Sequence, residues 1–143
     1  MVVSQISVFV ENKQGSLSAV TGILADAGVD IRAFTVADTT DFGILRMIVN
    51  DPDRAVKVLR DGGIAATKTA VLAVALQDEP GSMHKVMTVL ADNDIGVEYG
   101  YAFISRCKEV AYILVKVTEN ERAAEVLAAN GMPLVSAEEV YAL

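Results

Sequence analysis

The chain has 143 residues, 52% of them hydrophobic, and carries 19 acidic against 12 basic side chains, which gives a net charge of -7. This charge opposes binding to nucleic acid or to an anionic membrane unless basic residues cluster, and they do not, so small molecules and proteins remain as partners. No uncharged apolar run reaches about 18 residues and no basic segment precedes the first predicted strand, so we expect neither a membrane span nor a signal peptide, and a cytoplasmic protein.

A single cysteine, Cys107, cannot form a disulfide within the chain. It also has no second cysteine and no nearby histidine with which to hold zinc. We interpret Cys107 as a hairpin residue. No metal and no cofactor are expected.

The first half of the chain alternates strand and helix patterns. Residues 5–10 alternate between two faces and predict a strand. A turn at Gly15 follows, and apolar residues at helical spacing then predict a helix that stops at Gly28. Two apolar segments, 30–37 and 43–49, flank the four polar residues 38–41, Asp-Thr-Thr-Asp. They predict a hairpin.

A second helix and a short strand complete this half. Residues 50–53, Asn-Asp-Pro-Asp, predict a helix start, because they combine an Asx cap, a proline in the first turn and acids at the positive end of the helix dipole. The predicted buried stripe consists of Ala55, Val58 and Leu59. We expect the helix to end at residues 62–63, both glycine, and residues 64–69 to supply a final strand. The order is βαββαβ.

The pattern is then repeated. Residues 12–17 (Asn-Lys-Gln-Gly-Ser-Leu) recur as residues 78–83 (Asp-Glu-Pro-Gly-Ser-Met), and the block that begins at Arg54 recurs at Arg122. This duplication predicts two small domains, 1–69 and 70–143. Because a domain of about 70 residues is marginally stable alone, pairing of the two copies would add the missing burial.

The second half is predicted to follow the same order. Its predicted elements are strands at 71–76, 97–104 and 110–117 and a helix over 82–93. Thr118 and Glu121 match a capping box at the start of a last helix. Pro133 marks the entry to a last short strand, and no element is predicted for 136–143. Since no linker rich in glycine, serine or proline separates the halves, we expect them to pack rigidly.

Residues 71–76, Val-Leu-Ala-Val-Ala-Leu, are apolar on both faces of their strand. In a βαββαβ unit both helices cross on one side of the sheet and leave the other face bare. We therefore expect the second face of this strand to be covered by another sheet or chain, and the protein to be a homodimer or larger.

Many folds share this element order, so function must come from particular residues. A metal chaperone of this shape needs a Cys-x-x-Cys loop, which is absent. Segment 45–49 holds one arginine, Arg46, and no aromatic residue, which is a poor match to an RNA-binding strand. Nothing in the sequence commits a nucleophile beside the one histidine, His84. We expect the protein not to be an enzyme.

Two glycine turns remain, each between a first strand and a first helix. The motifs are Asn12-x-x-Gly15-x-Leu17 and Asp78-x-x-Gly81-x-Met83, followed by Gly28-Val29-Asp30-Ile31 and Asp94-Ile95-Gly96-Val97. With the helix pattern, the hairpin and the repeat, they resemble the ACT domain, a small-ligand-binding regulatory module of amino-acid metabolism, twice over nearly the whole chain. Residues 94–96 depart from the family's usual glycine before the strand.

The resemblance implies an α+β protein: two ferredoxin-like βαββαβ domains forming a continuous antiparallel sheet with helices on one face. Such domains bind an amino acid near this turn, at the domain or subunit interface. The implied function is that of a sensor that modulates a partner enzyme or regulator. The competing hypothesis is a structural subunit of an enzyme complex with no ligand of its own.

The chemistry of the turn agrees with a free amino acid as ligand. Its carboxylate would accept hydrogen bonds from the N–H groups of Gly15, Ser16 and Leu17, and its ammonium would donate to the Asn12 amide or the Asp78 carboxylate. The candidate ligand-binding residues are Asn12, Gly15, Ser16, Leu17, Asp78, Gly81, Ser82 and Met83. The alternative is that the Asx residues only tie down a turn and the serines only cap a helix.

The two turns are not expected to be equivalent. The first carries Lys13 and Gln14, whereas the second carries Asp78, Glu79 and Pro80, which add negative charge and remove an N–H donor. The first turn is therefore predicted to hold a ligand carboxylate more tightly.

Three aromatic residues, Tyr99, Tyr101 and Phe103, share one face of a predicted strand. They could wall a pocket for an apolar side chain or pack in a core or an interface. His84 could touch a ligand, but at the start of a helix we expect it to be exposed.

Overall fold

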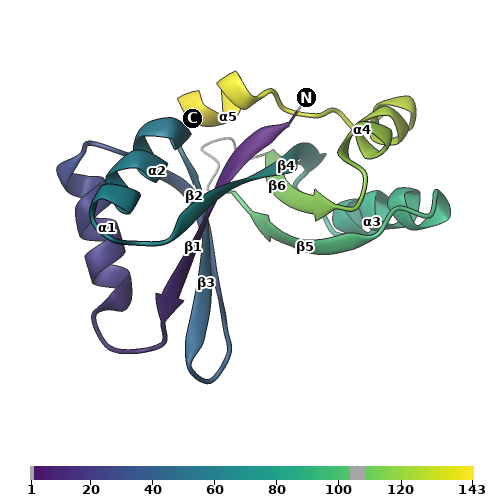
Figure 1. Ribbon diagram of the computed structural model, residues 1–143. Coiled ribbons are helices and arrows are strands. Elements are labelled where there is room, and N and C mark those ends of the chain that lie inside the picture. The colour runs from purple at the N-terminus through teal and green to yellow at the C-terminus, as the bar shows by residue number, and fades with distance from the viewer. Residues whose placement is uncertain (1, 104–108) are drawn as a thin grey trace. The chain divides into compact units, whose positions relative to one another are not determined.

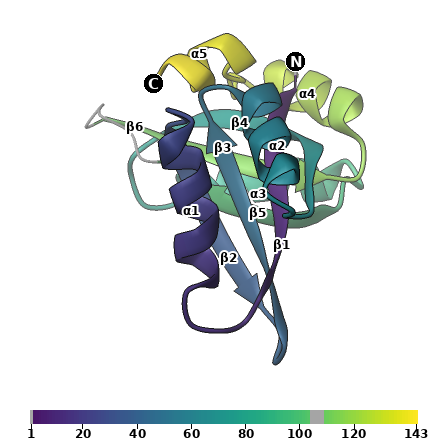
Figure 2. The same ribbon diagram turned by 60° about the vertical axis from the view of Figure 1, so that its left-hand side comes forward.

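In the computed structural model, which describes residues 2–103 and 109–143, the chain folds into two compact units. The first unit comprises Ser4–Thr69, and the second comprises Ala70–Leu143 together with the residues before Ser4. Figures 1 and 2 show the helices and strands of each unit. Cys107 and its predicted hairpin position lie outside the described residues.

The first unit has the predicted order of elements. They are β1 (Val3–Glu11), α1 (Ser16–Asp26), β2 (Ile31–Asp38), β3 (Phe42–Val49), α2 (Pro52–Asp61) and the first residues of β4 (Ala66–Gln77). Strand β3 pairs antiparallel with both β1 and β2, and the strand order is β2-β3-β1-β4. The predicted hairpin is thus confirmed.

The core of the first unit lies between its helices and one face of its sheet. Figure 2 shows α1 and α2 on the same side of β1 and β3. Alternate residues of β1, namely Ile6, Val8 and Val10, are buried with Leu24 of α1 and Leu59 of α2. The period-2 pattern of β1 therefore identified the core face correctly.

The start of α2 follows the predicted capping chemistry. The Asp51 side chain accepts a hydrogen bond from Arg54 N at 3.1 Å, and Pro52 is the first helical residue, where its missing N–H costs nothing.

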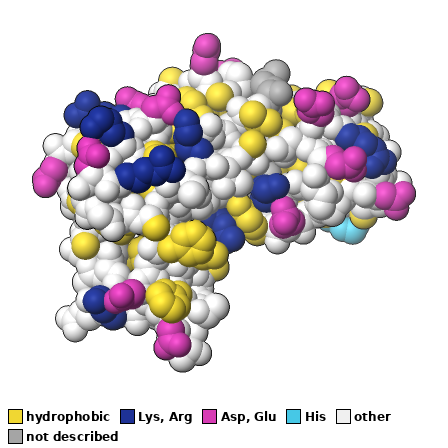
Figure 3. All heavy atoms as spheres, in the orientation of Figure 1, with side chains coloured by type: hydrophobic (Ala, Val, Ile, Leu, Met, Phe, Trp, Pro, Cys, Tyr) yellow, Lys and Arg dark blue, Asp and Glu magenta, His cyan; other side chains and the backbone are white. Residues whose placement is uncertain are grey.

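Basic side chains on this unit are interspersed with acids. Lys57 lies 2.8 Å from Asp61, and Lys68 lies 2.5 Å from Asp53. Figure 3 shows dark blue and magenta side chains mixed in this region. Both basic side chains are thus paired with an acid of the same unit.

The second unit repeats the order. Its further elements are α3 (Ser82–Asp92), β5 (Val97–Ala102), β6 (Val110–Val117), α4 (Asn120–Ala129) and α5 (Ala137–Ala142). Strand β6 pairs antiparallel with β4 and β5. Read along all six strands, the order is β2-β3-β1-β4-β6-β5. This confirms the α+β fold class, an antiparallel sheet carrying βαββαβ twice.

The two strands predicted at 64–69 and 71–76 form one strand. β4 runs for 12 residues, Ala66–Gln77, through the point where the second copy begins. No glycine or proline interrupts it, and Thr67 and Thr69 favour extended backbone, so nothing in this segment ends the strand.

Residues 71–74 are already buried within the single chain, each with at most 1% of its surface exposed. Leu72 and Val74 belong to the core of the second unit. The prediction that both faces of this strand are covered is therefore confirmed for residues 71–74, but no second chain is needed to bury them, and Ala75 and Leu76 stay partly exposed.

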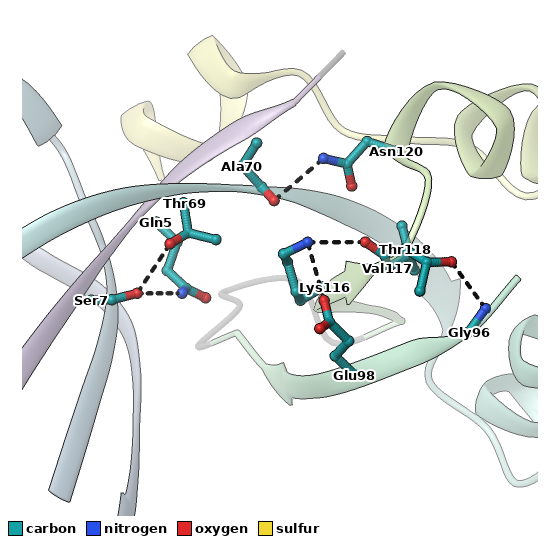
Figure 4. Close-up of polar contacts among 10 residues, drawn as sticks. All are labelled: Gln5, Ser7, Thr69, Ala70, Gly96, Glu98, Lys116, Val117, Thr118 and Asn120. Carbon is teal, nitrogen blue, oxygen red and sulfur yellow. Dashed lines mark hydrogen bonds and ion pairs between the residues drawn. The ribbon is translucent and has the colours of Figure 1, made fainter.

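The predicted capping box of α4 is also wrong. The N-cap residue is Glu119, with no side-chain capping bond, while the Thr118 hydroxyl accepts a hydrogen bond from Gly96 N at 3.3 Å (Figure 4). The hydroxyl joins the end of β6 to the start of β5 instead of capping the helix.

In place of the last short strand predicted after Pro133, the structure has a single antiparallel bridge between Leu134 and Val74. The tail without a predicted element forms α5, whose start carries the capping box that α4 lacks: Ser136 Oγ accepts from Glu139 N at 3.2 Å, and Glu139 Oε2 accepts from Ser136 N at 3.0 Å. Val140 of α5 is fully buried.

Polar residues are buried on the other face of β1. Gln5 is fully buried and donates from Nε2 to Ser7 Oγ at 3.0 Å, and Ser7 Oγ lies 3.3 Å from Thr69 Oγ1 (Figure 4). These bonds offset the cost of removing the side chains from water.

None of the helices in the described part of the chain is both long enough and apolar enough to cross a membrane.

Candidate functional site

The two glycine turns have the same backbone conformation. Gly15 (φ 87°, ψ -8°) and Gly81 (φ 91°, ψ -12°) are the N-caps of α1 and α3, in the left-handed region that glycine enters without steric cost. No side chain caps either helix, and Ser16 and Ser82 are the first helical residues. The alternative in which the serines cap the helices is therefore wrong.

The backbone hydrogen bonds of the two turns also match. In the first turn, Asn12 N donates to Asp41 O (2.9 Å), Lys13 N to Glu11 O (2.9 Å) and Ser16 N to Lys13 O (3.3 Å). The equivalent bonds of the second turn run from Asp78 N to Glu109 O (3.0 Å), from Glu79 N to Gln77 O (2.9 Å) and from Ser82 N to Glu79 O (3.3 Å). The last bond of each set closes a turn with glycine third, and the second position of such a turn accepts Pro80.

These bonds change the predicted set of donors. The N–H of Ser16 is engaged within its own turn, although at a long distance of 3.3 Å. Among the described residues, the N–H of Leu17 has no partner. Donors of this kind at a helix start attract carboxylates.

Asn12 plays the structural part of its two predicted roles. Its Nδ2 donates to Thr39 O at 3.3 Å and to Thr40 O at 3.4 Å, and so ties the turn to the β2–β3 hairpin. The amide oxygen is the atom that remains for a ligand.

A hollow lies beside the first turn, with a volume of about 540 Å³. It is lined by Phe9, Val10, Glu11, Lys13, Gln14, Gly15, Ser16, Ala19, Val20, Gly63, Ile64 and Ala65. These residues come from the end of β1, the glycine turn, the start of α1 and the loop after α2.

The second unit has a hollow of about 340 Å³ in the corresponding place. It is lined by Ala75, Leu76, Gln77, Glu79, Ser82, Lys85, Val86, Val110, Asn130, Gly131, Met132 and Pro133. Both volumes fall in the range of small-molecule sites.

Only part of the predicted set lines these hollows. Gly15 and Ser16 line the first, and Ser82 lines the second. The predicted residues outside the two linings are Asn12, Leu17, Asp78, Gly81 and Met83. Leu17 and Met83 are instead exposed on the surface, by 42% and 48%.

Sequence reasoning missed the loops after α2 and α4, which close one side of each hollow. The signal was present, because Gly63 and Gly131 recur at matching places in the repeat. Both have positive φ, 78° and 73°, which marks a backbone turn that needs glycine.

The charges beside the two turns differ. Lys13 Nζ lies 2.7 Å from Glu11 Oε2 on the surface. The hydrogen bond and the charge of Lys13 lower the pKa of Glu11, and the same contact raises the pKa of Lys13. In the second repeat these positions hold Gln77 and Glu79, which carry no such pair.

Of the three predicted aromatic residues Tyr99, Tyr101 and Phe103, only Phe103 is seen in a packing role. Phe103 is buried and meets Tyr112 edge to face, with ring centroids 5.8 Å apart. Tyr99 and Tyr101 are half-buried, and neither lines the two hollows. His84 is exposed on the first turn of α3, as expected.

Comparison with known proteins agrees with this geometry. A family model described as an ACT domain pair matches residues 1–143. The chain therefore belongs to the ACT domain pair family, as the sequence motifs predicted.

Solved structures include a closely similar protein, BT0572 from Bacteroides thetaiotaomicron, with 36% identity, a TM-score of 0.94, and coverage of 100% of this chain and 98% of that one. The regulatory subunit of aspartate kinase from Thermus thermophilus, in its ligand-free form, has 14% identity and a TM-score of 0.61, with 88% and 90% coverage. The regulatory subunit from Thermus flavus has 17% identity and a TM-score of 0.64, with 88% of each chain covered. The last two share the fold. No curated protein matches the sequence.

Proposed function

We propose that this protein is a non-enzymatic sensor that binds a free amino acid at its glycine turns and modulates a partner enzyme or regulator. The observation that carries the proposal is the pairing of a ligand-sized hollow with a glycine-capped helix start, formed twice by different residues. A turn with only a local structural role would not need a hollow beside it.

The turn offers complementary groups to an amino acid. Backbone N–H groups at Gly15 and Leu17, or at Gly81 and Met83, are placed at a helix start that favours a carboxylate. The Asn12 amide oxygen is the acceptor proposed for a ligand ammonium. The remaining predicted residues, Ser16, Asp78 and Ser82, are proposed to line or flank the bound ligand.

The regulatory output is proposed to pass through a separate protein. Membership of the ACT domain pair family supports this, and so does the fold shared with chains described as regulatory subunits of aspartate kinase. We propose two domains, 1–69 and 70–143, acting in the cytoplasm where enzymes of amino-acid metabolism work.

We also propose a homodimer or larger assembly, now because of exposed aromatic side chains and not because of the strand at residues 71–76. Large apolar side chains of the first unit are exposed in the single chain: Phe9 by 57%, Phe34 by 59% and Phe42 by 58%. The same exposure favours the second candidate function, an assembly subunit of an enzyme complex without a ligand of its own.

Thermal unfolding with each of the twenty amino acids at millimolar concentration separates the two candidates. At one hundred times its dissociation constant, a ligand of the folded state adds about 2.7 kcal/mol, or roughly 5 to 11 °C for a chain of this size. A sensor shows this shift with one amino acid or a small related group. An assembly subunit leaves the transition unmoved with all of them.

A further inference from the structure

Each hollow is lined by one acidic and one basic side chain, but these side chains are paired in the first hollow and unpaired in the second. In the first, Glu11 and Lys13 neutralise each other at 2.7 Å. The second is lined by Glu79 and Lys85, and among the described residues neither side chain forms an ion pair. A separated carboxylate and ammonium in one hollow suit a ligand that itself carries both charges.

A hydroxyl in the second hollow also has no partner within the described part of the chain. Ser82 is only 7% exposed and lines the hollow, and its Oγ has no hydrogen bond within the described part of the chain. The oxygen atom itself keeps accessible surface, unlike Arg32 Nε and Asn120 Oδ1, which are the buried side-chain atoms without a partner in the described residues. The equivalent of Ser82 in the first hollow, Ser16, is more exposed. The Ser82 hydroxyl is therefore a free donor and acceptor that a molecule in the second hollow can reach.

The rest of the second hollow is mostly aliphatic. Its lining includes Leu76, Val86, Val110 and Met132, and Leu76 and Met132 pack against the core of the unit. Where the first hollow has Ala19, the second has Lys85, so a positive charge is added one helical turn from the glycine turn. Charged groups and an apolar wall thus occur together.

We propose that the second hollow is the amino-acid site of this protein and that it selects an aliphatic side chain. This assignment rests on the proposed sensor function and names its site and ligand class. Glu79 receives the ligand ammonium, and Lys85 and the Ser82 hydroxyl bind the ligand carboxylate together with the free N–H groups of α3. Leu76, Val86 and Met132 contact the aliphatic side chain.

The assignment reverses the order expected from the loop sequences. That expectation counted Lys13 as a free positive charge and did not include Lys85. With Lys13 paired to Glu11 and Lys85 lining the other hollow, the balance of available charge favours the second site.

Calorimetric titration of the full chain with L-leucine tests the site. Lys85→Met keeps the aliphatic stem and removes the charge, and should weaken binding at least tenfold. Its matched control, Lys13→Met in the first hollow, should change affinity less than twofold. Glu79→Gln against Glu11→Gln should show the same contrast, and Ser82→Ala should weaken binding at least threefold. Circular dichroism and unfolding curves verify that each variant is folded.

Two leucine analogues test whether binding needs both the ammonium and the carboxylate of the ligand. 4-Methylpentanoate lacks the ammonium and L-leucinamide lacks the carboxylate, and each should bind at least tenfold more weakly than L-leucine. L-Glutamate and L-lysine should bind more weakly than L-leucine, because their charged side chains would face the aliphatic wall.

The outcomes separate this inference from the function on which it rests. If an amino acid binds but Lys13→Met weakens it and Lys85→Met does not, the sensor function stands and the second hollow is the wrong site. If a charged amino acid binds better than L-leucine, the aliphatic selection is refuted. If none of the twenty amino acids binds, the sensor function itself fails, and the site assignment fails with it.

Discussion

Asp94 adopts in the second repeat the left-handed backbone conformation that Gly28 adopts in the first, with φ of 57° against 69°. The surrounding hydrogen bonds agree: Gly28 N donates to Ala25 O and Asp94 N to Ala91 O, both at 3.0 Å. The departure from the usual glycine before the strand therefore preserves the shape of the helix end, since aspartate tolerates this region better than most residues.

Replacing Asp94 by glycine should raise the free energy of unfolding by up to about 1 kcal/mol, because relief of the left-handed conformation outweighs the added flexibility of the unfolded chain. Gly28→Ala should lower the same free energy by roughly 1 to 2 kcal/mol. Urea unfolding of both variants measures the change. A loss of stability in Asp94→Gly would mean that the aspartate side chain contributes more than its strain costs.

The N-cap residues of the two equivalent helices, α2 and α4, should contribute different amounts to the free energy of unfolding. Asp51→Ala removes the bond from Arg54 N and should cost about 1 kcal/mol. Glu119, the N-cap of α4, makes no capping bond and only an exposed ion pair with Arg122 at 2.9 Å, so Glu119→Ala should cost less than about 0.5 kcal/mol. Chemical denaturation compares them, and equal losses would contradict the capping argument.

Local signals predicted most of the fold because each had a physical cause confined to a few residues. Asp51 and Pro52 marked a helix start, and Gly15 and Gly81 marked turns that need positive φ. The predicted capping box at Thr118 was wrong for a tertiary reason. Its hydroxyl bonds Gly96 N, 22 residues away, which a local pattern does not contain.

The sequence predicted only one wall of the candidate site, the glycine turn. The glycine turns are visible as sequence motifs, whereas the loops after α2 and α4 approach them only through folding. The matching positions of Gly63 and Gly131 in the repeat do not show by themselves that these residues line a hollow. The ion pair of Lys13 with Glu11 likewise depends on side-chain geometry. Sequence spacing therefore located the turns but not the balance of charge around them.

The capping box of α5 should make this helix sensitive to acid. Hydrogen bonds from the backbone N–H and the hydroxyl of Ser136 hold the pKa of Glu139 below its ordinary value. A lowered folded-state pKa means that the stabilisation is present above the unfolded-state pKa of about 4.3 and is lost as pH falls through the folded value.

Amide hydrogen exchange of residues 137–142 between pH 6 and pH 3 is the measurement, corrected for the intrinsic pH dependence of exchange. Protection should decrease below about pH 4.3 in the wild-type chain. In Glu139→Gln it should be lower at pH 6 and nearly independent of pH over this window. A wild-type helix that keeps full protection at pH 3 would refute the link.

Exposed aromatic residues of the first unit should contribute to self-association. Phe42 pairs with Glu11 across β1 and β3, and Phe9 lies two residues from Glu11, so both phenylalanines share the face opposite the helices. Replacing both by serine should weaken a dimer without unfolding the chain, because each is more than half exposed. Sedimentation velocity at micromolar concentration tests this, with Leu143→Ser as a control, and a wild-type monomer would contradict the proposed homodimer.

The glycines of the two turns provide the last test, because their backbone conformation and the space around their Cα atoms are the same. Gly15 and Gly81 have φ of 87° and 91°, and a Cβ at either position meets no atom within 4 Å. Valine at each should therefore cost similar stability, through backbone strain and not through a clash. The two variants serve as controls for each other, so a difference in ligand affinity reports the ligand. If the second hollow is the site, Gly81→Val should lower amino-acid affinity at least tenfold and Gly15→Val much less. The loop sequences alone predict the opposite order, with the larger loss in Gly15→Val. Calorimetric titration of both folded variants decides between the two: a loss confined to Gly15→Val restores the first turn as the carboxylate site, and equal losses show that the two turns bind equivalently.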